Sequence, residues 1–234
     1  MRVGIICAGD SEVEPFLALM KKCQTSEKAM LKFYEGKIND VEVVTLFCGA
    51  CKVNAAIAAQ IIIDTYRVDC VINAGTAGGM DPKLEIFDTV IATEVAYHDV
   101  APNILTEFHP WMKSVYFKMD QALLSLAEKA VEKLEIKDKI FWGRMVTGEA
   151  FIADEGREKI NKEFSLLTVD METASIAHVC YVNNIPFISI RSITDTATHS
   201  GSEHFEQNCE KAAIMAKDVT VALLAEIYDT CHNS

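Results

Sequence analysis

The amino-acid sequence predicts an α/β fold in which one central mixed β-sheet is flanked by helices. Short apolar runs alternate with helical patterns along the chain, which is typical of strands that are connected by helices. Several of these runs are continuously apolar, as expected for strands that are covered on both faces. The 234 residues show no internal repeat, low-complexity tract or linker, so residues 1–234 are expected to form a single domain.

Seven runs are expected to be strands because they are short and apolar. They are Arg2–Cys7, Val41–Phe47, Cys70–Ala74, Thr89–Val95, Ile140–Val146, Leu166–Val169 and Pro186–Ile193. Five segments are expected to be helices, and the last four lack internal Pro and Gly and carry apolar residues at three- and four-residue spacing. They are Glu12–Lys22, Val53–Tyr66, Gln121–Leu134, Glu172–Asn183 and Phe205–Tyr228.

The first helix is expected to begin at a capping box. Ser11 fits the N-cap, and Glu14 follows it three residues later. Glu12 then lies at a helix N-terminus just beyond the first strand, where the helix dipole favours a carboxylate. On local sequence alone, that dipole would be a sufficient reason for an acid at this position.

The least regular stretch runs from Asp99 to Lys118 and contains Pro102 and Pro110. A segment of this length in a compact domain is usually functional or lies at an interface, and a plain surface excursion is the alternative. Its large apolar residues are Ile104, Leu105, Phe108, Trp111, Val115, Tyr116 and Phe117. Because a monomer rarely exposes so many apolar groups, they predict a closed homodimer.

The chain is strongly acidic, with 34 Asp and Glu against 22 Lys and Arg and a net charge of −12. This balance argues against nucleic acid or an anionic membrane as a partner, because both bind basic patches. The sequence shows neither a secretory signal nor an apolar run as long as a membrane span. The eight cysteines are scattered, and we expect them to be reduced thiols of a cytoplasmic protein.

Two carboxylates stand where apolar strands end. Glu172 follows the run 166–169, and Asp195 follows the run 186–193. In an open α/β sheet, ligands bind outside the carboxyl ends of the strands, so both acids are expected to reach one ligand. Neither a metal nor a cofactor is expected: Cys48 and Cys51 form a lone CxxC, no His has ligand spacing, and the turn 75–79 does not match a dinucleotide fingerprint.

The segments around these acids resemble a known family. Val-Asp-Met-Glu-Thr-Ala at 169–174, followed by Arg-Ser-Ile-Thr-Asp at 191–195, resembles the purine nucleoside phosphorylase/nucleosidase superfamily. Further segments come in the order and spacing of its methylthioadenosine/S-adenosylhomocysteine nucleosidases: 3–12, 52–56, 73–79, 97–99 and 148–152. This resemblance covers nearly the whole chain. It implies a nucleoside phosphorylase-like fold, a homodimer, and hydrolysis that releases adenine and a thio-ribose. Methionine salvage is one pathway that such products could feed, and quorum signalling is another.

Breaking an N-glycosidic bond requires protonation of the leaving base, a deprotonated water and a stabilised sugar cation, and carboxyl groups serve the first two tasks. The resemblance implies that Asp195 protonates the purine N7 and that Glu12 activates the water. It implies that Glu172 accepts hydrogen bonds from the ribose hydroxyls, with Met171 under the sugar and Arg191 close to it.

The resemblance also implies the remaining contacts of the substrate. Phe151 stacks on the adenine, Ile152 offers backbone groups to its edge, and Thr76 and Phe205 complete the pocket. Two positions depart from the family pattern, since Gly9 and Ala50 are smaller than the residues expected beside the 5′ substituent. The segment 101–105 departs as well, and in this family it helps to form the 5′ pocket across a dimer interface.

Three alternatives remain. A phosphorylase would need arginines to hold phosphate, but the chain has Glu12 and Glu14 after the first strand and Asn73 before the glycine turn. A nucleosidase could act on another 5′-substituted adenosine, for example aminofutalosine. A nucleoside-binding protein without catalysis is disfavoured because Glu12, Glu172 and Asp195 are all present.

Overall fold

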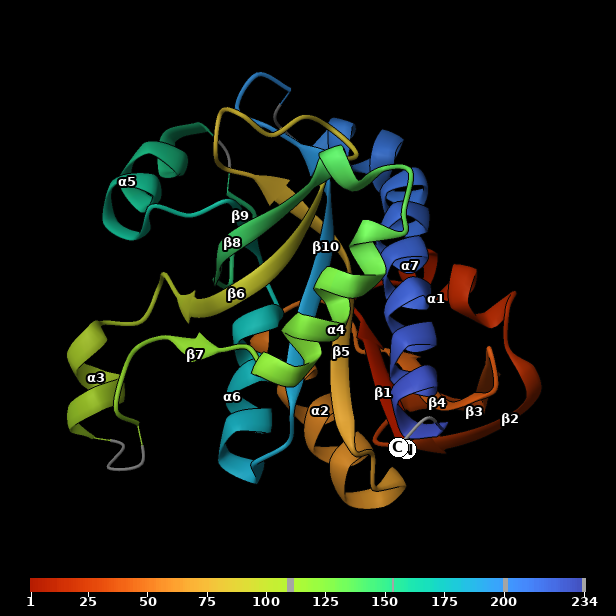
Figure 1. Cartoon of the computed structure of the whole chain (residues 1–234). Coiled ribbons are helices and arrows are strands. Elements are labelled where there is room, and N and C mark those ends of the chain that lie inside the picture. The colour runs from red at the N-terminus through yellow and green to blue at the C-terminus, as the bar shows by residue number, and fades with distance from the viewer. Residues whose placement is uncertain (109–111, 153, 200–201, 233–234) are drawn as a thin grey trace.

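A mixed β-sheet of ten strands lies at the centre of the molecule (Figure 1). The computed structural model describes residues 1–108, 112–152, 154–199 and 202–232. The strands are β1 Arg2–Cys7, β2 Lys21–Lys28, β3 Leu31–Ile38, β4 Val41–Phe47, β5 Cys70–Gly79, β6 Thr89–Tyr97, β7 Phe117–Lys118, β8 Ile140–Thr147, β9 Thr168–Asp170 and β10 Phe187–Asp195.

Part of this sheet closes on itself. Strand β10 pairs with both β5 and β6, and the pairing continues through β8 and β9 back to β5. The other side of β5 pairs with β1, from which β4, β3 and β2 extend the sheet. Since β1, β5 and β10 run parallel, their carboxyl ends meet at one edge.

Helices cover both faces of the sheet (Figure 1). On one face α2 packs against α6, and on the other the long α7 lies over β10 and β5 and contacts α1 and α4. The helices are α1 Asp10–Leu17, α2 Lys52–Tyr66, α3 Pro102–Glu107, α4 Gln121–Glu132, α5 Asp154–Phe164, α6 Thr173–Asn183 and α7 Ser202–His232, with a short 3₁₀ helix at Lys137–Lys139. The predicted α/β class, mixed sheet and flanking helices are confirmed.

The first predicted helix is wrong in its extent. It was expected over Glu12–Lys22, but α1 ends at Leu17 and Lys21 already begins β2. Strands β2 and β3 form a hairpin whose turn residues Ala29 and Met30 have φ of 52° and 62°. Such a turn is usually marked by Asn-Gly or Asp-Gly, and β2 is polar and largely exposed, so neither signal of a hairpin was present.

The predicted capping box is also wrong in register. Helix α1 begins at Asp10 with Gly9 as N-cap, so Glu12 and not Glu14 is the third helical residue. The Glu12 carboxylate accepts hydrogen bonds from the backbone N–H groups of Ala8 at 2.6 Å and Gly9 at 3.2 Å. The acid at the end of the first strand is therefore bound back to the chain that precedes its own helix.

The segment from 99 to 118 is less irregular than expected. It contains α3, which begins at a proline as helices often do, and the short strand β7, which pairs with β6. Helix α5 was not predicted at all. Its residues are mostly charged, and this leaves a weak apolar pattern.

Candidate active site

A cavity of about 300 Å³ opens where β1, β5 and β10 reach their carboxyl ends. The loop after β4, the segments after β8 and β9 and the start of α7 complete its wall. All predicted site residues except Arg191 line it: Gly9, Glu12, Ala50, Thr76, Phe151, Ile152, Met171, Glu172, Asp195 and Phe205. The structure thus brings residues from seven separate segments of the chain to one cavity.

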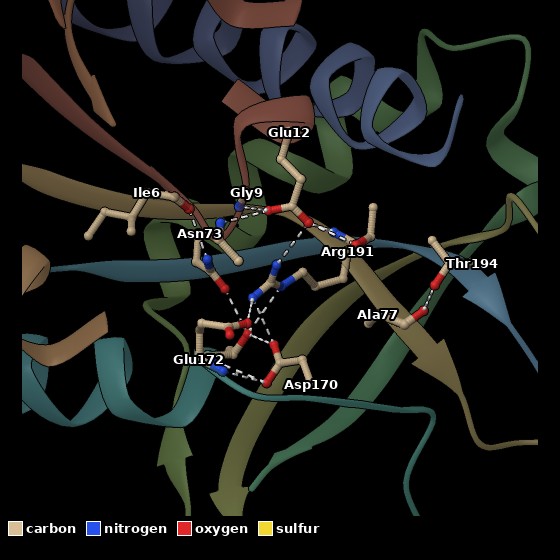
Figure 2. Close-up of polar contacts among 12 residues, drawn as sticks. Ile6, Gly9, Glu12, Asn73, Ala77, Asp170, Glu172, Arg191 and Thr194 are labelled. Atoms are coloured by element: carbon tan, nitrogen blue, oxygen red, sulfur yellow. Dashed lines mark hydrogen bonds and ion pairs between the residues drawn. The ribbon is translucent and has the colours of Figure 1, made fainter. Parts of the chain in front are cut away.

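Arg191 lies behind the cavity wall and is 0% exposed. Figure 2 shows its guanidinium surrounded by three carboxylates. Its Nη2 lies 3.0 Å from Asp170 Oδ2 and 3.3 Å from Glu172 Oε2, and its Nη1 lies 3.8 Å from Glu12 Oε1. A buried charge needs partners, and here a single cation orients three acids that come from different elements.

Glu12 is held by hydrogen bonds on both carboxylate oxygens. Besides the two N–H groups at the start of α1, Thr76 donates from its backbone at 2.7 Å and from its hydroxyl at 2.8 Å. Gly75 permits this approach, since a Cβ there would lie 2.5 Å from Glu12 Oε1. Glu12 is buried and yet lines the cavity, so its orientation is fixed before any ligand arrives.

Glu172 follows β9 and is the N-cap of α6. Its Oε1 accepts a hydrogen bond from the backbone N–H of Cys51 at 2.9 Å. Burial raises the pKa of Glu172 from its ordinary 4.5 to about 7; Arg191 opposes the rise and the nearby Asp170 adds to it. The acid can therefore be neutral or charged near neutral pH, depending on what lies against it.

Asp195 ends β10 and is buried. Its Oδ1 accepts a hydrogen bond from the hydroxyl of Thr194 at 2.9 Å, and its Oδ2 accepts one from Nη2 of Arg157 at 2.6 Å. Arg157 lies on α5 and is itself buried. Sequence reasoning missed it because nothing in the pattern of residues 154–164 indicated a helix next to the site.

Asp170 was missed as well, although it belongs to the motif at 169–174. It accepts hydrogen bonds from the Thr147 hydroxyl at 2.6 Å and from the backbone N–H groups of Glu172 and Thr173. It also pairs with Arg191. Its position two residues before Glu172 was a usable signal, because both acids follow the same strand.

The remaining lining of the cavity is apolar or small. Phe151 is 45% exposed and Phe205 is 37% exposed, so both rings stand at the mouth. A Cβ added at Gly9 would meet only the Ser11 hydroxyl, at 3.8 Å. Space is therefore free beside Gly9, which is one of the residues that line the cavity.

The described part of the chain contains no cluster of three or more His, Cys, Asp or Glu side chains arranged to hold a metal ion. Its helices also include none with both the length and the apolar composition that a bilayer crossing requires.

Comparison with known proteins relates this geometry to a family. The model of the phosphorylase superfamily matches residues 2–225. A 5′-methylthioadenosine/S-adenosylhomocysteine nucleosidase of Pseudoalteromonas translucida is 37% identical over 236 residues, covering 97% of this chain and 98% of that protein. The solved structure of such a nucleosidase from Neisseria meningitidis, in complex with methylthio-immucillin-A, is 30% identical with a TM-score of 0.88, covering 95% of this chain and 98% of that one. A structure from Colwellia psychrerythraea in complex with adenine is 32% identical with a TM-score of 0.86, covering 97% and 95%.

The raised pKa of Glu172 predicts how stability depends on pH. Ionising this acid costs more in the folded protein than in the unfolded chain, so its contribution to the free energy of unfolding falls as pH rises from about 4.5 to about 7. Glu172→Gln removes this dependence. The difference in the free energy of unfolding between variant and wild type should therefore shift by about 2 to 3 kcal/mol in favour of the variant when the pH is raised from 5 to 8. Urea denaturation of wild type and variant at pH 5 and at pH 8 measures this shift. Any effect of the amide on stability that does not depend on pH is the same at both pH values and cancels in the comparison. An equal difference at the two pH values would contradict the prediction.

Proposed function

The chain belongs to the phosphorylase superfamily and, within it, to the 5′-methylthioadenosine/S-adenosylhomocysteine nucleosidases, and we propose that it hydrolyses the N-glycosidic bond of one or both of these substrates. The products are adenine and the thio-ribose. The observation that carries this proposal is that Glu12, Glu172 and Asp195 line one cavity although they come from three separate segments. Hydrolysis of a glycosidic bond needs acids on two sides of the bond.

The proposed reaction divides the work between two acids. Asp195 gives its proton to N7 of adenine, while the bond from the sugar C1′ to N9 breaks and its electron pair stays on the base. Glu12 takes a proton from a water molecule, whose oxygen forms the new bond to C1′. Hydrogen bonds from Thr76, Ala8 and Gly9 fix the orientation of Glu12. This supports its role, because a base that is already oriented costs no reorganisation free energy during the reaction.

The other residues are proposed to bind the substrate. Glu172 accepts hydrogen bonds from the ribose hydroxyls, and Arg191 holds Glu172 from behind the wall. Met171 packs under the sugar. The exposed ring of Phe151 stacks on the adenine, and Ile152 presents its backbone to the edge of the base. Thr76 and Phe205 close the pocket on the remaining sides.

Phosphorolysis is the rival reaction, and the charges of the site disfavour it. No Lys or Arg stands among the described residues that line the cavity. Arg191 lies behind the wall, and three carboxylates already surround it. A phosphate ion at this place would meet an excess of negative charge, whereas a neutral water would not.

Product analysis tests the proposed function. We expect adenine and free methylthioribose from 5′-methylthioadenosine, at a rate that does not change when phosphate is added. The reason is the lack of phosphate-binding cations in the cavity. Chromatography with and without phosphate gives the answer. A ribose 1-phosphate product would establish a phosphorylase, and the absence of free adenine would favour a binding protein.

Asp195→Asn should lower the turnover by about 10²- to 10⁴-fold, which is the usual contribution of general acid–base catalysis. The amide keeps the shape of the side chain but has no proton to give. Glu12→Gln should also lose turnover and still bind the substrate, because the amide fills the same place but cannot take a proton from water, and only its oxygen can still accept the hydrogen bonds that both carboxylate oxygens accept in wild type. Steady-state kinetics and titration calorimetry separate the two effects. Turnover within about threefold of wild type in either variant would remove that residue from the mechanism.

The 5′ pocket is proposed to be roomy, as the space beside Gly9 and the small exposed Ala50 support. We therefore expect kcat/KM values for 5′-methylthioadenosine and S-adenosylhomocysteine to differ by no more than the roughly 10- to 200-fold that apolar pockets provide. Aminofutalosine is the third substrate to compare. A preference for methylthioadenosine beyond about a thousandfold would show a tightly closed pocket, and a preference for aminofutalosine would change the assigned substrate.

A homodimer is proposed as the functional form. Two of the apolar residues expected at the interface, Leu105 and Phe117, are instead buried within the chain, and Trp111 lies outside the described residues. Apolar side chains are nevertheless exposed on α2 and α6 and on or directly after α3, and α2 packs against α6. They are Val53, Ile57, Ile104, Phe108, Tyr181 and Val182. Within one chain, no described residue from 99 to 118 lines the cavity, so a partner's segment could close the 5′ side.

Light scattering at micromolar concentration should give the mass of a dimer, because such a set of exposed apolar groups is unusual on a monomer. Ile104→Glu together with Phe108→Glu should weaken the dimer, while Met30→Glu, at an exposed apolar residue of the β2–β3 turn, should leave it intact. A monomeric wild-type mass would contradict the proposal.

The compartment and the pathway are proposed as well. The eight free thiols support a reducing compartment, the cytoplasm. The proposed products suit a role in methionine salvage.

A further inference from the structure

Arg157 connects helix α5 to the proposed general acid. Its Nη2 donates to Asp195 Oδ2 at 2.6 Å, and its Nη1 donates to the backbone carbonyl of Gly79 at the end of β5. The side chains of Arg157 and Asp195 are 6% and 2% exposed. This is a direct ion pair with almost no water around it, so solvent screens it little.

Arg157 does not line the cavity, whereas Asp195 does. The guanidinium therefore reaches a ligand only through the carboxyl group that it holds. Gly78 makes room for that carboxyl group, since a Cβ there would lie 3.3 Å from Asp195 Oδ2. Thr194 holds the other oxygen, so each carboxyl oxygen has one donor and the orientation of the group is defined.

We propose that Arg157 is a positioning residue that orients Asp195 and stabilises the carboxylate left behind when the proton passes to adenine. This inference rests on the proposed function. In the step concerned, the O–H bond of Asp195 breaks, the new N7–H bond forms, and the electron pair of the C1′–N9 bond goes to the base. Asp195 gains a full negative charge on a side chain that is 2% exposed.

The burial of Asp195 makes this charge expensive without a partner. Removing a carboxyl group from water favours its neutral form, while an adjacent guanidinium favours its charged form. An acid that must first carry a proton and then release it works best when such influences are balanced. Arg157 favours the charged carboxylate at the moment of proton transfer, and it does so from a fixed position.

A purely structural role for Arg157 is the competing explanation, because its bond to Gly79 also fastens α5 to β5. Asn161 provides the matched control. It lies one turn further along α5 and donates from Nδ2 to the carbonyl of Met80 at 2.8 Å. Asn161 thus fastens the same helix to the same end of β5 without touching Asp195.

The experiment compares Arg157→Met, Arg157→Lys and Asn161→Ala on two substrates. One is 5′-methylthioadenosine, and the other is 4-nitrophenyl 5-methylthio-β-riboside, whose leaving group needs no proton. For Arg157→Met we expect a loss of about 10- to 100-fold in kcat on the adenine substrate, with KM within about threefold, and a much smaller loss on the nitrophenyl substrate. Arg157→Lys should recover part of the loss because it restores the charge.

The pH dependence gives a second readout. Without the guanidinium, the carboxyl group keeps its proton to higher pH, so the alkaline limb of the kcat profile should move to higher pH in Arg157→Met. Asn161→Ala should change neither the profile nor the ratio of the two substrates. Equal losses in kcat on both substrates, or an alkaline limb at the same pH as in wild type, would show that Arg157 has only a structural role. A wild-type enzyme that releases no adenine would overturn the proposed function and this inference together.

Discussion

The buried guanidinium of Arg191 is the interaction on which the rest of the site depends. It has no exposure to solvent, and its charge is compensated by Glu12, Asp170 and Glu172. Breaking a buried pair by removing one partner leaves an uncompensated charge and is strongly destabilising. The three acids therefore cannot be placed independently of one another. Helix α1, strand β9 and the start of α6 all dock around this one cation.

Strand β5 makes this docking possible because three other strands pair with it. It lies beside β1 and β10 along its length and beside β9 at its end. The carboxyl ends of β1 and β10 therefore face each other across β5, and the loops that follow them meet there. Gly75 and Gly78 lie on β5 at these meeting points, where side chains of Glu12 and Asp195 approach the backbone too closely for a Cβ to fit without displacement. The fold thus sets the distance between the two acids through a single strand.

Sequence reasoning succeeded where local pattern and chemistry coincide. Strands β1 and β4 were predicted with the bounds that the structure has. Glu172 and Asp195 were expected at one ligand because each follows an apolar run, whereas Glu12 was assigned to the site through the family resemblance, and all three line the cavity. The β2–β3 hairpin and α5 were missed, since exposed polar strands and mostly charged helices carry little periodic signal. Arg157 was missed for a deeper reason. Its importance lies in a contact with Asp195, 38 positions away, and no local pattern encodes a tertiary ion pair.

The two guanidinium groups divide the cavity into sides of different charge. Around Arg191 three acids face one cation, so the side proposed for the sugar carries an excess of negative charge even if Glu172 is neutral. Around Asp195 one acid faces one cation, Arg157, so the side proposed for the base is positive while Asp195 holds its proton and balanced once the proton has passed to the base. In the cleavage of an N-glycosidic bond, positive charge develops on the sugar and electrons move to the base. Fixed charges in this arrangement are already in place when that separation develops, and such electrostatic preorganisation is usually the largest single contribution to catalysis. The same arrangement explains why a water nucleophile suits the site: an anion would have to approach the sugar through its most negative wall.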